Sequence, residues 1–203
     1  MAASNPQSAW RDVPVLAGRH AVLEPLRAGH AEGLRAALEG GGLERLAYAN
    51  VPAPERAAGY VEAALQARAC GEALPFAVLD AAGTVVGSTR FYRLEPEVPR
   101  LGIGYTWYAP RVQRTGVNTE CKLMLLQHAF EAMGCASVFF ETSLLNQASR
   151  RAIVRLGARQ EGVLRHHKRH ADGTLRDTVA FSIIDAEWPQ VRDRLRSRLE
   201  ANT

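Results

Sequence analysis

Apolar positions recur along the chain with two different periods, which predict its helices and strands. A short strand at 20–25 precedes two helices, at 31–38 and 54–70, in which apolar residues return every three or four positions. The later segments with a strand pattern are 74–80, 85–92, 101–108, 137–142, 158–167 and 175–184, and those with a helical pattern are 119–133, 147–156 and 188–199. The predicted order is β-α-α-β-β-β-α-β-α-β-β-α, without internal repeats.

Length and composition indicate one folded domain with a small extension. The chain has 203 residues, of which 47% are hydrophobic and 23% charged, far from the composition that keeps a chain disordered. The first residues show no sustained period, and Trp10 is their one candidate anchor. We expect a flexible arm over residues 1–18 and, at the other end, an amphipathic helix over 186–203 packed on the domain.

Charge and cysteine content limit which ligands and which cellular compartment we expect for this protein. Lys and Arg number 25 against 21 Asp and Glu, and this net charge of +4 is spread along the chain. Such a charge permits an acidic ligand without requiring nucleic acid. Three cysteines without CxxC spacing predict neither disulfides nor zinc, and no apolar run reaches the ~18 residues of a membrane helix. We expect a cytoplasmic protein that binds no metal, nucleic acid or membrane. The sequence is compatible with a homodimer.

A loop at 111–118 joins a strand to the most regular helix of the chain. The start of a helix leaves backbone N–H groups unpaired and carries about half a positive charge, so this junction suits an anion. Gly116 permits close backbone approach, and Arg111 and Arg114 add positive charge. The lysine of a nucleotide P-loop and the GxGxxG pattern are both missing from the sequence. The loop therefore predicts a phosphate cradle for a ligand other than ATP or NAD.

The two motifs Gln113-x-x-Gly116 and Asn146-x-x-Ser149 resemble those of the GNAT superfamily of acyl-CoA-dependent N-acetyltransferases, and within it the RimJ/RimL-like branch. The family's pyrophosphate loop, Q-x-x-G-x-[GA], matches Gln113 and Gly116, and Asn118 stands at its last position in place of glycine or alanine. The stretch from Gln113 to Lys122 is also similar to one subgroup that reads QRTGVNTEAK. The second motif, an Asn-x-x-Ser helix that ends in Leu-Gly and precedes Glu-Gly and a strand, matches Asn146, Ser149, Leu156, Gly157, Glu161 and Gly162. The resemblance covers residues 19–185.

The resemblance implies an α/β fold with a mixed central sheet that is flanked by helices and splayed near its middle. Acetyl-CoA would enter the splay as a co-substrate, with its pantetheine arm paired to the backbone of one strand end and its pyrophosphate on the N–H groups of the loop. Asn146 and Ser149 would contact it from the other side, although Asn146 also suits simple helix capping. The cofactor-binding residues expected are Thr106, Trp107, Tyr108, Val112, Gln113, Arg114, Thr115, Gly116, Val117, Asn118, Thr119, Asn146 and Ser149.

Two departures from the family pattern concern catalysis. The tyrosine that protonates the departing thiolate in many members is replaced by Ile153, and Ser149 is the nearest substitute. The strand that often reads Glu-Ile-Gly-Tyr has Gly102 in place of the glutamate, so the usual base is missing. A weak base favours an α-amine, whose deprotonation at pH 7 costs about 1–1.5 kcal/mol, over a lysine side chain, which costs about 4–5 kcal/mol.

The catalytic residues expected are Ser149, Glu141 and Tyr105. Glu141 is the favoured proton acceptor, and the alternatives are Glu120 or a water held by Tyr105 or Thr106. The predicted reaction is acetyl transfer to a primary amine, either a protein N-terminus or a small molecule, by direct attack in a ternary complex. The alternative is a non-catalytic acyl-CoA-binding module that kept the cradle and lost the base.

Two other features favour simpler interpretations. Cys121 lies among the leucines of its helix, which is more typical of packing than of a nucleophile. The basic run 166–170 leads into a hairpin turn without acidic or cysteine ligands nearby, so we expect a solvated hairpin at the acceptor entrance rather than a metal site.

Overall fold

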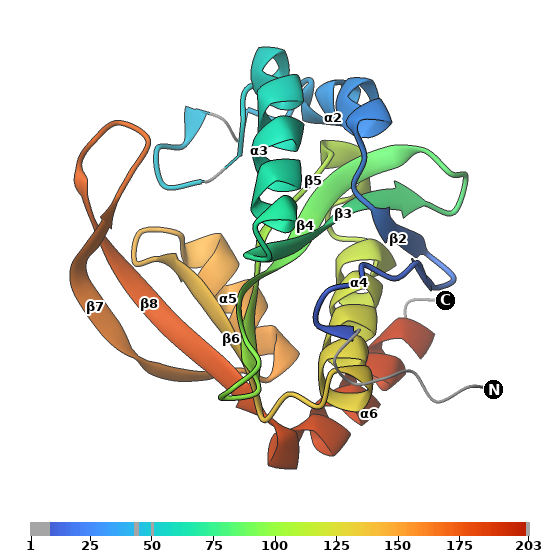
Figure 1. Cartoon of the computed structure of the whole chain (residues 1–203), viewed down its shortest axis with the longest axis vertical. Coiled ribbons are helices and arrows are strands. Elements are labelled where there is room, and N and C mark those ends of the chain that lie inside the picture. The colour runs from blue at the N-terminus through green and yellow to red at the C-terminus, as the bar shows by residue number, and fades with distance from the viewer. Residues whose placement is uncertain (1–8, 43–44, 50, 202–203) are drawn as a thin grey trace.

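The computed structural model describes residues 9–42, 45–49 and 51–201 and shows one mixed sheet with helices on both sides (Figure 1). The strand order is β1-β2-β3-β4-β5-β6-β8-β7, and every neighbouring pair is antiparallel except β5 and β6. The strands are β1 (Leu16–Ala17), β2 (Ala21–Pro25), β3 (Ala73–Asp80), β4 (Val85–Glu95), β5 (Arg100–Tyr108), β6 (Ser137–Ser143), β7 (Arg159–Arg169) and β8 (Leu175–Ile184). The predicted α/β fold with a mixed sheet is confirmed.

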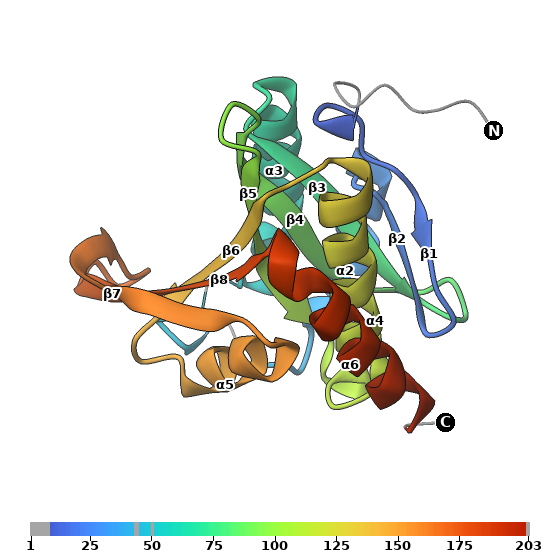
Figure 2. The ribbon, with the colours of Figure 1, turned by 90° about the horizontal axis from the view of Figure 1, so that it is seen from below.

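The helices form two layers. They are α2 (Ala31–Leu38), α3 (Ala57–Ala69), α4 (Gly116–Gln127), α5 (Gln147–Leu156) and α6 (Trp188–Glu200), with short 3-10 turns at Ala28–His30, Pro54–Arg56, Pro110–Val112 and Asp185–Glu187. Figure 2 shows α3 on one side of the sheet and α4 with α6 on the other. The last residues of the predicted helix 119–133 form a π-helical turn, His128–Ala132.

A continuous hydrophobic core lies between the sheet and these layers. Its fully buried side chains come from strands and helices on both sides, among them Phe76, Phe91, Phe181, Leu125, Leu126 and Leu195. Apolar burial is the main force that stabilises such a layered arrangement. The amphipathic helix α6 contributes Trp188, Val191 and Leu195 to it, as its sequence pattern predicts.

The expectation of a flexible arm does not hold for residues 9–18, while residues 1–8 lie outside the described residues. Ala9 and Val13 are buried in the core, and Trp10 donates a hydrogen bond from Nε1 to the Met133 carbonyl at 3.0 Å. Strand β1 then pairs with β2. The sequence pattern missed this packing because two buried side chains and a two-residue strand are too few to establish a period.

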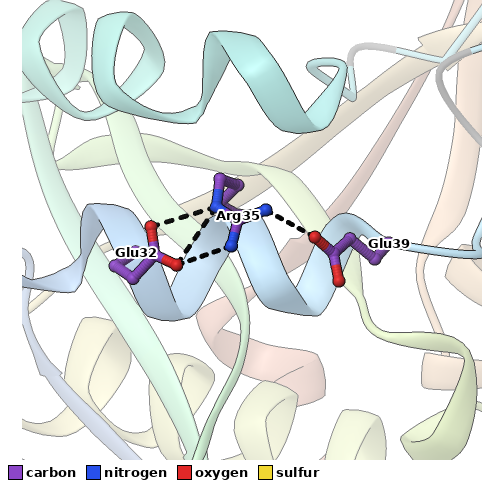
Figure 3. Close-up of polar contacts among 3 residues, drawn as sticks. All are labelled: Glu32, Arg35 and Glu39. Carbon is purple, nitrogen blue, oxygen red and sulfur yellow. Dashed lines mark hydrogen bonds and ion pairs between the residues drawn. The ribbon is translucent and has the colours of Figure 1, made fainter.

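The exposed face of α2 shows how surface arginines are paired in this protein. Arg35 contacts Glu32 three residues before it and Glu39 four residues after it (Figure 3). Such exposed pairs stabilise a helix only weakly, because water screens the charges. Arg90 and Arg176, by contrast, are buried.

Candidate active site

The central sheet opens between β5 and β6. These strands pair only over Arg100–Gly102 with Ser137–Phe139, and beyond this point β5 stays with β4 while β6 stays with β8. In β5, Tyr105 and Thr106 stand opposite the single residue Thr89, which is a β-bulge. Tyr105 has a φ of 52°, a left-handed conformation that non-glycine residues adopt at a cost. The bulge therefore redirects β5 where the splay begins.

The register of β5 determines which backbone groups face the opening. The Ala109 N–H donates to the Val86 carbonyl at 2.7 Å, across the paired residues Gly87 and Tyr108. In an antiparallel ladder this arrangement turns the N–H and C=O of Tyr108 away from β4, while those of Trp107 face it. The Tyr108 carbonyl accepts a hydrogen bond from the Gln113 side chain at 3.0 Å. Of the two residues, Tyr108 is thus the one whose backbone faces the splay.

A buried lysine connects the bulge to helix α4. Lys122 donates from Nζ to Thr106 Oγ1 at 2.7 Å, and Thr106 Oγ1 lies 2.8 Å from Thr89 Oγ1. Burial disfavours the ammonium and lowers the pKa of Lys122 to about 8. Sequence reasoning gave Lys122 no role, although a lysine between the buried positions Cys121 and Leu123 was a signal that its partner lies inside the protein.

The loop before α4 exposes the start of that helix. Thr115 is the N-cap: its Oγ1 accepts from the Val117 N–H at 3.3 Å and donates to the Val112 carbonyl at 2.7 Å. Gln113, Arg114 and Thr115 are exposed, whereas Val112 and Val117 belong to the core. The first turn of α4 is therefore partly open to solvent, since Gly116 and Val117 are buried while Asn118 and Thr119 are partly exposed.

Two residues of this loop make contacts that the sequence did not predict. A Cβ on Gly116 would lie 2.9 Å from the His20 ring, so the glycine makes room for a packed imidazole. Arg111 forms an ion pair with Asp80 at 2.6 Å, which directs its charge toward the turn between β3 and β4. Arg114 is thus the arginine of the loop with its side chain at the surface and no ion pair among the described residues.

Helix α5 begins beside the opening. Asn146 is its N-cap and accepts the Ser149 N–H at 3.0 Å, so the capping role considered for Asn146 is present. Ser149 is partly exposed, and its hydroxyl has no hydrogen-bond partner among residues 9–42, 45–49 and 51–201. Ile153 is 8% exposed and packs in the core. Ser149 is therefore a polar side chain with an unpaired hydroxyl in the first turn of α5, the helix that follows the splayed end of β6.

The two candidate carboxylates are both held by other groups. Glu141 contacts Arg93 Nη1 at 2.8 Å and Lys168 Nζ at 2.6 Å. Burial opposes its ionisation, but the hydrogen bond and charge of Lys168 and the charge of Arg93 outweigh this effect and lower its pKa. A carboxylate with a lowered pKa accepts a proton poorly. Glu120 accepts three backbone N–H groups, of Arg19, His20 and Ala21 at 2.8, 2.6 and 2.8 Å, and so fixes the start of β2 to α4.

Tyr92 fills the space beside Gly102, the residue that stands in place of the glutamate in the Glu-Ile-Gly-Tyr pattern. A Cβ on Gly102 would lie 2.6 Å from the Tyr92 ring and 2.7 Å from the Phe139 ring, and one on Gly104 would also meet Tyr92. The Tyr92 ring packs edge-on against Tyr105, with centroids 5.6 Å apart. The glycines of β5 thus accommodate an aromatic ring.

The three cysteines differ in their exposure to solvent. Cys70 is exposed, Cys121 and Cys135 are buried, and all three are free thiols. Burial raises the pKa of Cys121 to about 12, which makes its nucleophilic thiolate rare. Within the described residues, no three His, Cys, Asp or Glu side chains gather as a metal site would require. Over the same residues, no helix has the length and apolarity needed to cross a bilayer.

Comparison with known proteins agrees with this geometry. Residues 20–159 match the family model described as "Acetyltransferase (GNAT) domain". The "Uncharacterized N-acetyltransferase YoaA" of Bacillus subtilis (strain 168) is 30% identical over 100 residues, which are 49% of this chain and 55% of that protein. The chain thus spans about half the length of this relative.

Solved structures extend the similarity to nearly the whole chain. A GCN5-related N-acetyltransferase from Brucella melitensis has a TM-score of 0.84 and 29% identity, covering 95% of this chain and 90% of that one. Mycobacterium smegmatis RimJ in complex with CoA-disulfide shares the fold, with a TM-score of 0.76 and 23% identity over 94% of this chain and 96% of that one. The splay, the exposed start of α4 and the family match lead to one conclusion: the chain belongs to the GNAT acetyltransferase family.

Proposed function

We propose that the protein transfers an acetyl group from acetyl-CoA to a primary amine by direct attack in a ternary complex. The observation that carries this proposal is the end of the β5–β6 ladder at Gly102, which leaves the backbone of Tyr108 facing an opening next to the start of α4. An extended, amide-rich chain adds readily to a free strand edge, and phosphates suit a helix N-terminus. Acetyl-CoA contains both groups in one molecule.

The proposed binding residues lie on two sides of the cofactor. On one side, Tyr108 would pair with the pantetheine arm, while the N–H groups of 114–119 and the Arg114 side chain would hold the pyrophosphate. On the other side, the Asn146 amide and the Ser149 hydroxyl would contact the cofactor from α5. A bulged strand with fixed backbone donors positions and polarises the thioester carbonyl, which is the main requirement for attack by an amine.

The reaction needs one bond to form and one to break. The amine nitrogen attacks the thioester carbon, the C–S bond breaks, and the nitrogen loses a proton while the thiolate gains one. We assign the Ser149 hydroxyl to the departing thiolate. Because Glu141 is paired with two cations, the amine proton leaves through water near Tyr105, which suits an α-amine better than a lysine side chain. Such an acceptor fits a RimJ/RimL-like enzyme.

Thiol release from acetyl-CoA across a panel of peptides, amino acids and polyamines tests this proposal. We expect turnover with α-amines, and we expect Arg114→Ala to raise the KM for acetyl-CoA about 3- to 10-fold, the effect of losing one exposed phosphate contact. Arg11→Ala is the matched control, because Arg11 is exposed and its neighbour Trp10 contacts Met133, beyond the far end of α4.

A second candidate is a non-catalytic acyl-CoA-binding module, which Gly102 favours because the carboxylate common at this position is missing. A melting temperature that rises with CoA, together with no thiol release from any amine of the panel, would select this candidate and contradict the enzyme.

A further inference from the structure

Two arginines are buried beside the splay without a carboxylate partner. Arg90 on β4 is 7% exposed and Arg176 on β8 is 5% exposed. Within the described part of the chain, neither forms an ion pair, and the Nε of each lacks a hydrogen-bond acceptor. Burying an unpaired guanidinium costs free energy, so proteins rarely keep one without a use. The exposed Arg35, by contrast, holds two carboxylates (Figure 3).

Both arginines approach the same exposed tyrosine from different strands. The Arg90 guanidinium carbon lies 4.1 Å from the centre of the Tyr105 ring and 5.1 Å from that of Tyr60. Arg176 precedes by two residues Thr178, which pairs with Ser143 at the end of β6, and its charge interacts with Glu141 first and then with Tyr92 and Tyr105. Since Tyr105 is 43% exposed and sits in the bulge of β5, both positive charges border the opening of the sheet.

The neighbouring charges leave this pair unneutralised. Glu141 is already shared by Arg93 and Lys168, and Arg93 also lies 3.7 Å from Glu95. Lys168 stands opposite Arg176 in the β7–β8 ladder, so it adds positive charge rather than removing it. A ligand entering here would meet two desolvated guanidinium groups, each suited to a planar anion.

We propose that Arg90 and Arg176 bind an anionic group of the acceptor, so that the preferred substrate is a primary amine carrying a carboxylate or phosphate near its nitrogen. This inference rests on the proposed function, because it names the class of amine that the enzyme acetylates. The anion would lie against Tyr105, which places the attached amine at the opening where the thioester is expected. The arginines would then act by positioning the acceptor.

Matched pairs of acceptors test the charge preference. The pairs are an amino acid with its amide, a peptide with glutamate at its second position with the glutamine form, and a phosphorylated with an unphosphorylated amino alcohol. We expect kcat/KM to favour the anionic member of at least one pair about 10- to 100-fold, as for a charge-assisted contact. The pair that shows this preference identifies whether the anionic group is an α-carboxylate, a side-chain carboxylate or a phosphate. Equal turnover in all three pairs would overturn the proposal.

Variants separate binding from a structural role. Arg90→Met and Arg176→Met should abolish the preference, because they lower kcat/KM of the anionic members far more than that of the neutral members, and Arg90→Lys and Arg176→Lys should keep part of it. The melting temperature of the methionine variants should stay equal or rise, because an unpaired buried charge is removed. Arg165→Met, which removes an exposed arginine of β7, is the control and should keep the full preference. A lower melting temperature with equal losses for both members would show a purely structural role and overturn the proposal.

A binding measurement without acetyl-CoA distinguishes failure of the site from failure of the proposed function. Melting temperatures are compared in phosphate, oxalate and chloride at equal ionic strength for the wild type, Arg165→Met and the Arg90→Met/Arg176→Met double variant. A stabilisation by phosphate or oxalate that only the double variant loses supports the anion site even if no amine is acetylated. Acetyl transfer without charge preference, and anion effects equal in all three proteins, would refute the site while the enzyme stands.

Discussion

Lys122 Nζ lies 2.7 Å from Thr106 Oγ1, and this hydrogen bond joins the first half of α4 to the bulge of β5. The two elements carry different parts of the proposed cofactor site: the start of α4 would hold the phosphates, and the end of β5 would hold the pantetheine arm. A contact between them keeps both parts in register. The lysine is buried without a carboxylate among the described residues, so this geometry costs stability near neutral pH.

The cost predicts a pH dependence of folding stability. The pKa of Lys122 falls from an ordinary value of 10.5 to about 8 in the folded protein. Between these values the unfolded chain binds more protons, so stability from this group rises with pH; below about pH 8 the penalty is constant. In Lys122→Met the free energy of unfolding, minus that of the wild type, should fall by on the order of 2–3 kcal/mol from pH 8 to pH 10.

Urea unfolding of both proteins at intervals of one pH unit measures this difference. Using the difference removes the tyrosines and cysteines that titrate over the same range, since both proteins share them. A difference that stays constant from pH 7 to pH 10 would show that Lys122 keeps its ordinary pKa and contradict the burial argument.

Replacing Glu141 tests whether it is a base or a structural anion. Its lowered pKa means that it stabilises the fold above about pH 4.5 and that this stabilisation is lost as the pH falls through the pKa of the folded state. Glu141→Gln should cost roughly 1–2 kcal/mol at pH 7, discounted because both cationic partners are partly exposed. It should reduce kcat/KM less than tenfold, whereas loss of a general base costs about 10²–10⁴-fold.

The pH profile of kcat/KM provides the deciding measurement for this variant. Glu161→Gln, which changes an exposed carboxylate of β7, serves as control and should match the wild type. A loss above a hundredfold in Glu141→Gln, with disappearance of the acidic limb of the profile, would restore Glu141 as the proton acceptor.

The close packing at Gly102 predicts that the protein is sensitive to substitution there, although the backbone conformation of Gly102 does not require a glycine. A methyl group there would lie under 3.0 Å from both the Tyr92 and the Phe139 rings, so Gly102→Ala should destabilise the protein by about 1–3 kcal/mol. Gly162→Ala in β7 meets no atom within 4 Å and should change stability by less than about 0.5 kcal/mol. Denaturant unfolding of both variants gives the comparison; equal effects would refute the packing described for Tyr92.

Modification of thiols should occur only at the protein surface and should not affect catalysis. At pH 8, iodoacetamide should modify Cys70 in the folded protein and spare Cys121 and Cys135, because burial raises the pKa of each buried thiol to about 12. Mass spectrometry of peptides locates the label, with Cys70→Ser as the control that removes it. Acetyl transfer should survive the treatment; labelling of Cys121 with loss of turnover that acetyl-CoA prevents would point to a covalent mechanism.

Local patterns predicted most elements because their signals lie within a few residues. Thr115 and Asn146 cap helices through N–H groups two or three residues away, and Gly157 ends α5 with a left-handed φ of 112°. These interactions depend on neighbours in the chain, so periodicity and capping rules find them. The two motifs that identified the family lie at these same helix starts.

The sequence by itself determined the order of elements from β2 onward, the loop before α4 and the resemblance that led to acetyl-CoA. Tertiary structure alone decided the roles of Glu120, Glu141 and Lys122, and the burial of Arg90 and Arg176, because each depends on groups from distant strands. Glu120 binds backbone about 100 residues away. The sequence does not show whether a carboxylate or guanidinium group meets water, an opposite charge or no partner. Only the packing of the sheet and helices determines this.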